Sequence, residues 1–411
     1  MKPVVSAGKN GEPPRLPVHG RTPLLTEKGV CVLSGAQLDP SVPARLGGAA
    51  AACFPGGKFG VACDGKPLSH AVGRIFMGAA AAKGGRVGDF GDGFLSQMHF
   101  YSSFCGLHLG VFVACAHGRV RLHFCFPGGL PLPRETQLAL EERCQSGLAA
   151  RVSPAAFAEI SDMTGMQAIY QSALLREAAG RLSGQAVSVG SPNERVQMAM
   201  EDALYRLGAK TGDETVFRFG ADGTAVCAYR RGLGQIGQDR LLAVCCKAEL
   251  DAGNDLALPE DAPCALTRLA EACGRRALRY GRFAPASQDA PARRLAADRL
   301  YLRDALFLCL RVLGVQQSTS KPLDRLLREL PAFSVRRRTV PVAFPVSEFA
   351  DRFPHARRTD PFEAFALSFA GGCVRVFPGR RGNRVTLLAE AATPEAAEEL
   401  CGDLEARLRR H

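Results

Sequence analysis

The pattern of apolar and polar positions predicts alternating strands and helices along the first hundred residues. Residues 59–64 form an apolar segment typical of a buried strand, and residues 70–83 carry apolar side chains at helical spacing. A second strand is predicted over residues 86–90 and a third over residues 109–114. Short strands separated by a helix at this spacing are typical of a βαβ unit, so we expect a parallel sheet here.

The same alternation continues through the rest of the chain. After helical patterns over residues 135–145 and 154–181, a second α/β pattern has strands at 186–190, 216–219 and 225–229 and helices at 193–207 and 239–250. A third has helices at 266–273, 298–314 and 322–330, strands at 277–283 and 335–342, and a polar, Pro-containing loop at 285–294. The C-terminal region has strands at 365–369, 373–377 and 385–391. Its last helix, at 394–410, follows a Thr cap and starts with Pro.

This pattern and the length of 411 residues predict several domains rather than a single core. We expect an α/β fold class with three consecutive α/β domains, at residues 1–148, 149–255 and 256–345. A smaller α+β domain is predicted at residues 346–411.

Composition places the chain among ordinary soluble globular proteins, because 46% of its residues are hydrophobic and 22% are charged. No apolar run approaches the ~20 residues that a membrane-spanning helix needs, so we expect no membrane partner. Residues 1–26 are polar and lack the apolar segment of a signal peptide, which predicts a cytoplasmic protein. The 15 cysteines are scattered without a C-x-x-C pair and are interpreted as reduced thiols.

The formal net charge of +12 comes with a large excess of arginine over lysine. The arginines occur in short clusters spread over every predicted domain, without the interleaved aromatic residues of a nucleic-acid-binding face. We therefore expect no nucleic-acid partner. A basic cleft for a small anion is compatible with this charge.

Two motifs at the ends of predicted strands carry a resemblance to a known family. The first is Cys63-Asp64-Gly65-Lys66-Pro67-Leu68-Ser69, and the second is Ala114-Cys115-Ala116-His117-Gly118-Arg119. In order and spacing they resemble the G-R-D-x-R-x-S turn and the T-x-S-H-N-P loop of the α-D-phosphohexomutases, the family of phosphomannomutase, phosphoglucomutase and phosphoglucosamine mutase. Residues 321–331 and 390–397 are similar to two further segments of that family's scaffold.

The resemblance implies both a fold and a chemistry. The implied fold has three α/β/α domains of mixed sheet and a smaller α+β domain around a central cleft. The implied chemistry moves phosphate between two hydroxyls of one hexose. It needs a nucleophilic serine, a divalent cation and donors that hold the second phosphate.

The position of the family's serine is occupied by Ala116, whose methyl group cannot carry a phosphoryl group. His117 remains from that loop, and Asp64, Lys66 and Ser69 remain from the first motif. Cys115 is an alternative nucleophile, but a shift of one residue reverses the direction of a side chain on a strand. A buried thiol is therefore the favoured interpretation of Cys115.

The family's cation loop, D-G-D-x-D-R, corresponds to residues 220–225, where only Asp222 remains of three carboxylates. Mg²⁺ prefers more than one carboxylate or substrate phosphate, so a tight turn between strands is the favoured interpretation. We expect no cofactor, and Mg²⁺ only if the protein is an active mutase. The family's sugar-selecting loop, G-E-x-S-G-H, has no recognisable counterpart between residues 283 and 298.

The family's distal phosphate loop, R-P-S-G-T-E-P, corresponds to residues 377–383. Its arginine, serine and threonine are replaced, but four other arginines keep the segment strongly basic: Arg375, Arg380, Arg381 and Arg384. Guanidinium groups bind phosphate through paired hydrogen bonds, so these four are candidate phosphate ligands. An exposed basic hairpin is the alternative interpretation.

A glycine motif offers a competing signal. Gly232, Gly234 and Gly237 satisfy G-x-G-x-x-G between a predicted strand and a predicted helix, the pattern of a dinucleotide-binding turn. The match is interpreted as accidental, because Arg230 and Arg231 separate the strand from the glycines.

Two functional hypotheses follow. In the first, the chain is a catalytically inactive phosphohexomutase homologue of carbohydrate metabolism that binds a phosphosugar, another small anion or a protein partner. In the second, it is an active intramolecular phosphotransferase of the phosphomannomutase or phosphoglucomutase type with an atypical site. The joint loss of nucleophile, metal carboxylates, sugar loop and phosphate residues favours the first hypothesis.

Overall fold

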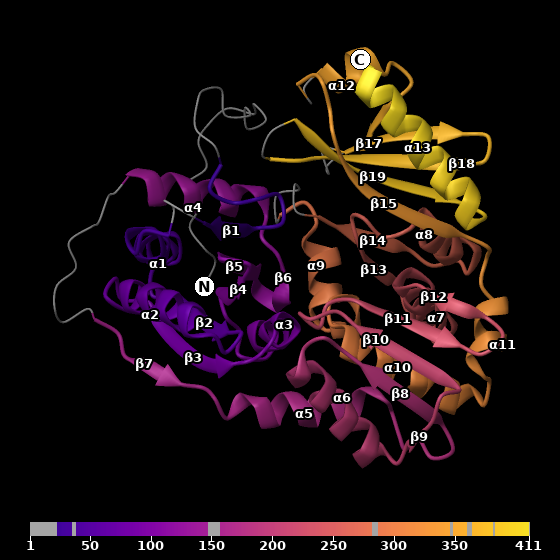
Figure 1. Ribbon diagram of the computed structural model, residues 1–411, viewed down its shortest axis with the longest axis horizontal. Coiled ribbons are helices and arrows are strands. Elements are labelled where there is room, and N and C mark those ends of the chain that lie inside the picture. The colour runs from indigo at the N-terminus through magenta and orange to yellow at the C-terminus, as the bar shows by residue number, and fades with distance from the viewer. Residues whose placement is uncertain are drawn as a thin grey trace.

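A computed structural model describes residues 23–34, 38–146, 157–281, 287–345, 348–359, 364–380 and 383–410. Within these residues the chain forms four β-sheets with helices packed around them (Figure 1). The sheets follow one another along the chain and contain seven, five, two and five strands. Each sheet with its helices is called a unit below. This arrangement confirms the predicted α/β fold class.

The first sheet has the strand order β1-β5-β4-β2-β3-β7, with β6 paired to β5. Its strands are β1 (Val30–Leu33), β2 (Lys58–Cys63), β3 (Arg86–Asp92), β4 (Leu109–Ala116), β5 (Arg119–Phe126), β6 (Leu130–Pro131) and β7 (Ile160–Asp162). β2 is parallel to both β3 and β4, whereas β4 and β5 form an antiparallel hairpin. The carboxyl ends of β2, β3 and β4 therefore meet at one edge of the sheet.

The helices of the first unit are α1 (Ser41–Cys53), α2 (Pro67–Ala81), α3 (Leu95–Phe104) and α4 (Arg134–Ser146). Side chains of α1, α2 and α4 pack with one set of alternate strand residues, such as Val61 and Val111. The intervening residues, such as Ala62 and Phe112, point to the opposite face and pack with α3. The apolar cluster on that second face continues into the second and third units.

The second sheet has the order β12-β11-β10-β8-β9. Its elements are α5 (Met166–Glu177), β8 (Ala186–Gly190), α6 (Glu194–Leu207), β9 (Lys210–Thr211), β10 (Thr215–Phe219), β11 (Val226–Arg230), β12 (Gly234–Ile236) and α7 (Gln238–Asp251). The helix predicted over residues 154–181 is shorter in the structure, because Ile160–Asp162 forms β7 and pairs in parallel with β3. The first sheet thus takes a strand from beyond residue 148.

The third sheet consists of two parallel strands, β13 (Leu256–Pro259) and β14 (Ala277–Tyr280). Its helices are α8 (Cys264–Ala272), α9 (Ala290–Ala297), α10 (Ala305–Thr319) and α11 (Leu323–Arg328). The prediction of a loop at 285–294 was wrong for α9, which carries Pro291 in its first turn, where a helix tolerates proline. The helix predicted from 298 begins at Ala305, because the Asp304 carboxylate caps it by accepting from the N–H groups of Leu306 and Phe307.

The fourth sheet is antiparallel, in the order β15-β19-β18-β17-β16. Its elements are β15 (Ser334–Pro341), α12 (Phe349–Arg352), β16 (Arg357–Thr359), β17 (Ala364–Phe369), β18 (Gly372–Pro378), β19 (Arg384–Ala391) and α13 (Pro394–Arg410). α13 spans the residues predicted for it. β15, which the sequence analysis assigned to the third domain, is a strand of this fourth sheet.

The apolar cores show how these units are joined. One cluster runs from the first sheet through the second unit into the third, so these three share buried surface. The fourth unit has a core of its own, which includes Phe349, Val374 and Leu404. Charged groups link it to the rest of the protein, among them the ion pair of Arg337 on β15 with Asp239 on α7. In the described residues, no helix is both long enough and apolar enough to cross a bilayer.

Candidate functional site

The carboxyl ends of β2, β3 and β4 bring the two predicted motifs together. Asp64 directly follows β2, and its backbone N–H donates to the carbonyl of Val113 on β4 at 3.0 Å. Asp92 is the last residue of β3 and lies opposite Cys63 in the sheet register. Ligands in α/β folds bind outside the carboxyl ends of parallel strands. This edge of the first sheet is therefore the candidate functional site.

Ala116 lies in a tight hairpin at this edge. It is the last residue of β4 and the register partner of Arg119, the first residue of β5. His117 and Gly118 alone connect the two strands, with φ angles of 50° and 67°. Positive φ at both central residues is what a type I′ hairpin turn requires. The position of the family's phosphoserine loop is thus a two-residue turn with the His117 side chain exposed.

The remaining side chains of the first motif hold the end of β4. Asp64 Oδ2 accepts from the backbone N–H of Cys115 at 2.9 Å, and Lys66 Nζ donates to the Cys115 carbonyl. Lys66 Nζ also lies 3.2 Å from Asp64 Oδ2. Burial acts to raise the pKa of Asp64, but the Ser69 hydroxyl and the N–H groups of Cys115 and Lys66 outweigh it and lower that pKa. Asp64 is therefore a hydrogen-bonded anion that braces the hairpin.

Ser69, retained from the first motif, and Cys115, the alternative nucleophile, both lie against the core. Ser69 lies in the first turn of α2, where it is fully buried. Cys115 packs against the apolar core of the first unit, but it is half-buried rather than buried as the sequence analysis favoured.

A polar network that the sequence analysis missed joins the first and second units here. Arg195, in the first turn of α6, donates to Asp92 Oδ2 at 2.6 Å and to the carbonyl of Asp64 at 3.2 Å. His70 Nε2 lies 2.8 Å from the other oxygen of Asp92. The position of Asp92 at a strand end was a usable signal. The role of Arg195 was not readable, because it pairs with a residue 103 positions away.

Gly65, in the turn after β2, lies in close contact with the second unit. Its φ is +84°, and a Cβ built on it would lie 2.7 Å from the guanidinium nitrogens of Arg195. The turn after β2 is therefore covered by a side chain of the second unit.

Asp222 lies in the connection between β10 and β11, as predicted for a turn. Its Oδ1 accepts from the backbone N–H and the hydroxyl of Thr224, at 3.0 and 2.8 Å. Its own carbonyl accepts from the N–H of Ser96 at the start of α3. The next residue, Gly223, has a φ of +73°. The carboxylate thus stabilises its own turn, which is fixed against the first unit.

The donor set at this turn does not fit Mg²⁺. Mg²⁺ takes an octahedral shell that includes carboxylates or substrate phosphates, and Asp222 offers one carboxylate with an oxygen already hydrogen-bonded. Among the described residues, the one group of three or more His, Cys, Asp and Glu with ligand atoms close enough to share an ion lies elsewhere, at Cys264, Cys373 and Glu390.

Arg375, a candidate phosphate ligand, points into the protein. It is buried on β18, where Nη1 donates to the carbonyl of Glu260 at 2.6 Å and Nη2 donates to that of Ala262. Both carbonyls belong to the connection between β13 and α8. The guanidinium group therefore holds the fourth unit on the third, and these contacts leave it poorly placed for phosphate.

Arg380, the second candidate, reaches across to the first unit. Its Nη2 donates to Glu141 Oε2 on α4 at 2.6 Å, and its Nη1 donates to Gln137 Oε1 at 3.1 Å. The other carboxylate oxygen of Glu141 accepts from the N–H of Leu25 at 2.6 Å. The side chains of Arg380 and Glu141 are only 4% and 9% exposed. Arg380 is thus fixed to the first unit by a buried ion pair. Arg384 is exposed at the start of β19, and Arg381 lies outside the described residues.

The glycine motif lies on a hairpin. β11 and β12 are antiparallel, with Gly234 the first residue of β12, and α7 begins only after Gly237. A dinucleotide turn joins a strand directly to a helix, so this geometry agrees with an accidental match.

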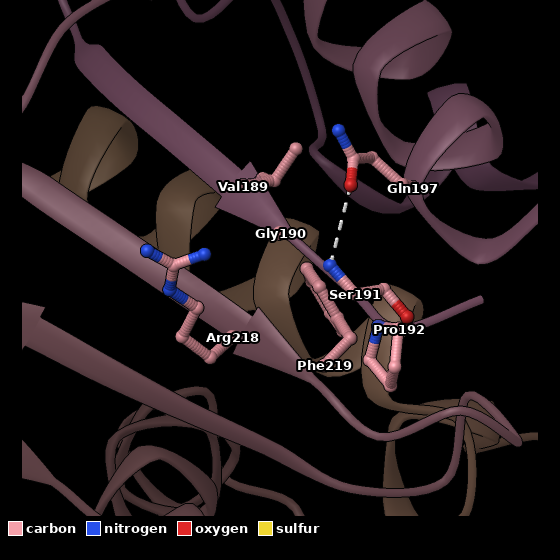
Figure 2. A pocket seen from close by; sticks show the side chains of 7 residues that line it. All are labelled: Val189, Gly190, Ser191, Pro192, Gln197, Arg218 and Phe219. Carbon is pink, nitrogen blue, oxygen red and sulfur yellow. Dashed lines mark hydrogen bonds between the residues drawn. The ribbon is translucent and has the colours of Figure 1, made fainter. Parts of the chain in front are cut away.

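A pocket of about 410 Å³ lies at the carboxyl ends of β8 and β10 in the second unit. Arg218 of β10 and Gln197 of α6 lie on opposite sides of the end of β8 (Figure 2). The backbone N–H of Ser191 donates to Gln197 Oε1 at 3.4 Å. A second pocket, of about 830 Å³, lies beside the edge strand β16 and is lined by Arg357 and Arg358. Neither pocket includes the residues predicted from the two motifs.

Comparisons with known proteins place this geometry in context. No family model matches the sequence. No curated protein matches it either. Solved structures do match: a phosphoglucomutase/phosphomannomutase family protein from Burkholderia thailandensis aligns with a TM-score of 0.68 at 16% identity, over 91% of this chain and 94% of that chain.

Two further structures agree. A protein provisionally described as a phosphomannomutase, from Thermus thermophilus, has a TM-score of 0.66 at 15% identity, over 92% of this chain and 97% of its own. The N-acetylphosphoglucosamine mutase of Aspergillus fumigatus, solved with GlcNAc-6P and magnesium, has a TM-score of 0.53 at 12% identity, over 93% and 95%. The chain is thus a multidomain α/β protein of the sugar-phosphate mutase type of architecture. Its particular fold is that of the α-D-phosphohexomutase superfamily, and the resemblance inferred from the motifs is confirmed at that level.

Proposed function

We propose that this chain is a non-catalytic protein with the phosphohexomutase fold, which acts by binding rather than by moving a phosphoryl group. The hairpin at Ala116 carries this proposal. A mutase needs an atom that forms a bond to phosphorus and later releases it, and the alanine methyl has no lone pair to do so. The two-residue turn also leaves no loop that can carry a neighbouring nucleophile over a ligand.

The other parts of the site support the same proposal. Asp222 Oδ1 accepts a hydrogen bond from the N–H of Thr224, and Asp64 accepts one from the N–H of Cys115. Arg380 forms an ion pair with Glu141. Each of these three groups, which correspond to catalytic or phosphate-binding residues of the family, has a protein partner. A mutase site needs these groups free for metal and phosphate in the ground state.

The contacts of the arginines favour a scaffold role over phosphosugar binding. Arg375 donates to two backbone carbonyls and Arg380 to a carboxylate, so a phosphate at this loop has to displace existing bonds. A second protein that binds the outer surface needs no such displacement. We therefore propose a protein partner as the main ligand, with phosphosugar binding as the outcome to be tested against it.

The first experiment is a turnover assay of the purified protein. It uses Mg²⁺, glucose 1,6-bisphosphate and the 1-phosphates of glucose, mannose and N-acetylglucosamine. We expect no isomerisation, because removing a covalent nucleophile lowers turnover by about 10⁶-fold in enzymes that depend on one. Turnover that disappears in Asp222→Ala would overturn the proposal and favour an active phosphotransferase with an atypical site.

The second experiment separates ligand binding from a scaffold role. A ligand that binds only the native state raises the melting temperature in proportion to its concentration relative to Kd. We expect no rise with hexose phosphates up to millimolar concentration. A rise that is lost in Arg384→Ala, the exposed cation beside the basic loop, would show that phosphosugar binding is retained.

A further inference from the structure

Two cysteines from different units converge at the junction of the third and fourth units. Cys264 is the first residue of α8, and Cys373 lies on β18 directly opposite Glu390 of β19. The two Sγ atoms and a carboxylate oxygen of Glu390 all lie within 4.8 Å of one another. Both cysteines are half-buried.

Glu390 organises this junction. One of its oxygens accepts from the N–H of Ala265 at 2.9 Å and from Arg268 Nη2 at 2.7 Å. The other accepts from the N–H of Cys264. A carboxylate buried to 2% exposure therefore fixes the start of α8 beneath β18 and β19, with Cys264 held near Cys373.

Three guanidinium groups lie around the two sulfurs and the Glu390 carboxylate. Arg279 and Arg375 both donate to the carbonyl of Ala262, two residues before Cys264, and Arg268 pairs with Glu390. The N-terminus of α8 adds the positive end of a helix dipole. The arginines and the helix dipole favour a thiolate at Cys264, and the charge of Glu390 opposes it. This environment disfavours a bound cation, because three guanidinium groups surround the site and three N–H donors already use the oxygens of Glu390.

We propose that Cys264 and Cys373 are a reactive thiol pair that peroxide oxidises to a disulfide linking the third unit to the fourth. In the first step the Cys264 thiolate attacks an oxygen of hydrogen peroxide, which gives a sulfenic acid and, after proton uptake, one water. In the second step the Cys373 sulfur attacks the sulfenic sulfur, an S–S bond forms, and a second water leaves. Two thiols lose two electrons and two protons, and one peroxide is reduced to two waters.

Cys264 is the attacking residue. A hydrogen bond from the Cys373 thiol, with the charges of Arg375 and Arg279, outweighs burial and lowers the pKa of Cys264 below that of an ordinary thiol. The pKa of Cys373 is raised, chiefly through the same hydrogen bond. Cys264 is also the first residue of α8, where the helix dipole favours the anion, so it is assigned as the attacking sulfur and Cys373 as the proton donor.

The disulfide restrains the fourth unit. Its two cysteines lie on either side of the junction that Arg375 and Glu390 stabilise with polar contacts. A covalent bond there keeps the fourth unit docked on the third even when those polar contacts break. The proposal is independent of any catalytic or ligand-binding role of the strand-end site.

Peptide mapping tests the pair directly. The reduced protein is treated with a slight excess of hydrogen peroxide, the remaining thiols are alkylated, and the digest is analysed by mass spectrometry. We expect a crosslinked peptide containing Cys264 and Cys373, with the loss of two alkylatable thiols per chain, reversed by dithiothreitol. Cys373→Ser removes the crosslink, whereas Cys273→Ser, at the exposed cysteine just beyond the other end of α8, leaves it intact.

Two further measurements make the result decisive. The rate of alkylation of Cys264 should rise at a lower pH than that of an ordinary thiol, whose pKa is about 8.5. Oxidation should raise the melting temperature of the wild type and of Cys273→Ser but not of Cys373→Ser. A digest in which Cys264 is crosslinked to no residue or to a different cysteine overturns the proposal, as does zinc bound stoichiometrically to the reduced protein and lost in Cys264→Ser.

Discussion

The ion pair between Arg380 and Glu141 provides the sharpest test of how the fourth unit is held. We consider Arg380→Ala. The two side chains are 4% and 9% exposed, so the substitution leaves the Glu141 carboxylate buried without its partner. Removing one member of a buried pair destabilises proteins by about 3–5 kcal/mol. The N–H of Leu25 still donates to Glu141, so we expect the lower end of that range, about 3 kcal/mol.

The assay is urea unfolding followed by circular dichroism, since the chain has no tryptophan. Glu141→Gln in the Arg380→Ala background removes the uncompensated charge but keeps an oxygen for Leu25. The double variant should therefore be more stable than Arg380→Ala alone. Arg384→Ala is the matched control at the exposed end of the same loop, and it should change the free energy of unfolding by less than about 0.5 kcal/mol. Equal, small effects of Arg380→Ala and Arg384→Ala would refute the reasoning.

The remaining predictions concern the strand-end site and the core. Gly65→Ala should lower the free energy of unfolding by about 1–3 kcal/mol, measured by urea unfolding, because its φ is +84° and the new Cβ meets Arg195 at 2.7 Å. Gly118→Val should destabilise the hairpin by a similar amount, since a β-branched residue is strained at a φ of +67°. Burial, with the charge of Arg303, lowers the pKa of His99 to about 4. The unfolded chain then takes up the proton first, so stability should fall as pH drops from 6.5 toward 4, by at most about 3 kcal/mol, and His99→Gln should flatten that part of the profile. Ala116→Ser should fold normally and give no phosphoenzyme with glucose 1,6-bisphosphate by intact mass.

Much of the fold was predictable because apolar periodicity is a local signal. α13 was predicted to its end residues, since Pro394 and the preceding Thr393 mark its start, and β8 matched its predicted range. α1 was missed because its sequence, rich in alanine and glycine, lacks a strong apolar stripe. β5 was missed although it alternates between buried and half-buried or exposed positions along most of its length.

The candidate site was predictable in position but not in contacts. Asp64 and Ala116 were assigned to strand ends, and the structure places both at one edge of the first sheet. The partners of the arginines could not be predicted from the sequence. Arg380 pairs with a residue 239 positions away, and Arg375 pairs with carbonyls 113 and 115 positions away. Such pairs depend on how whole units pack, and a local pattern carries no information about that packing.

In three of the altered segments, a charged side chain has a partner inside the protein. In an enzyme of this fold, arginines and carboxylates at the site are balanced by phosphate and metal when the ligand is bound. A chain that binds no such ligand has to satisfy those groups internally, because a buried charge without a partner is strongly destabilising. Here Asp64 accepts a hydrogen bond from Cys115 and Asp222 accepts one from Thr224. Arg380 donates to the carboxylate of Glu141.

These pairings are consistent with the proposed non-catalytic function. Each pairing stabilises the folded state, and each removes a group that catalysis requires to be free. Active sites keep such groups unsatisfied at the expense of stability, so the proposed non-catalytic function predicts that these groups gain internal partners. Reversion of a single residue therefore leaves the other pairings in place, and recovery of a mutase would require the hairpin, the turn at Asp222 and the contact between Arg380 and Glu141 to change at the same time.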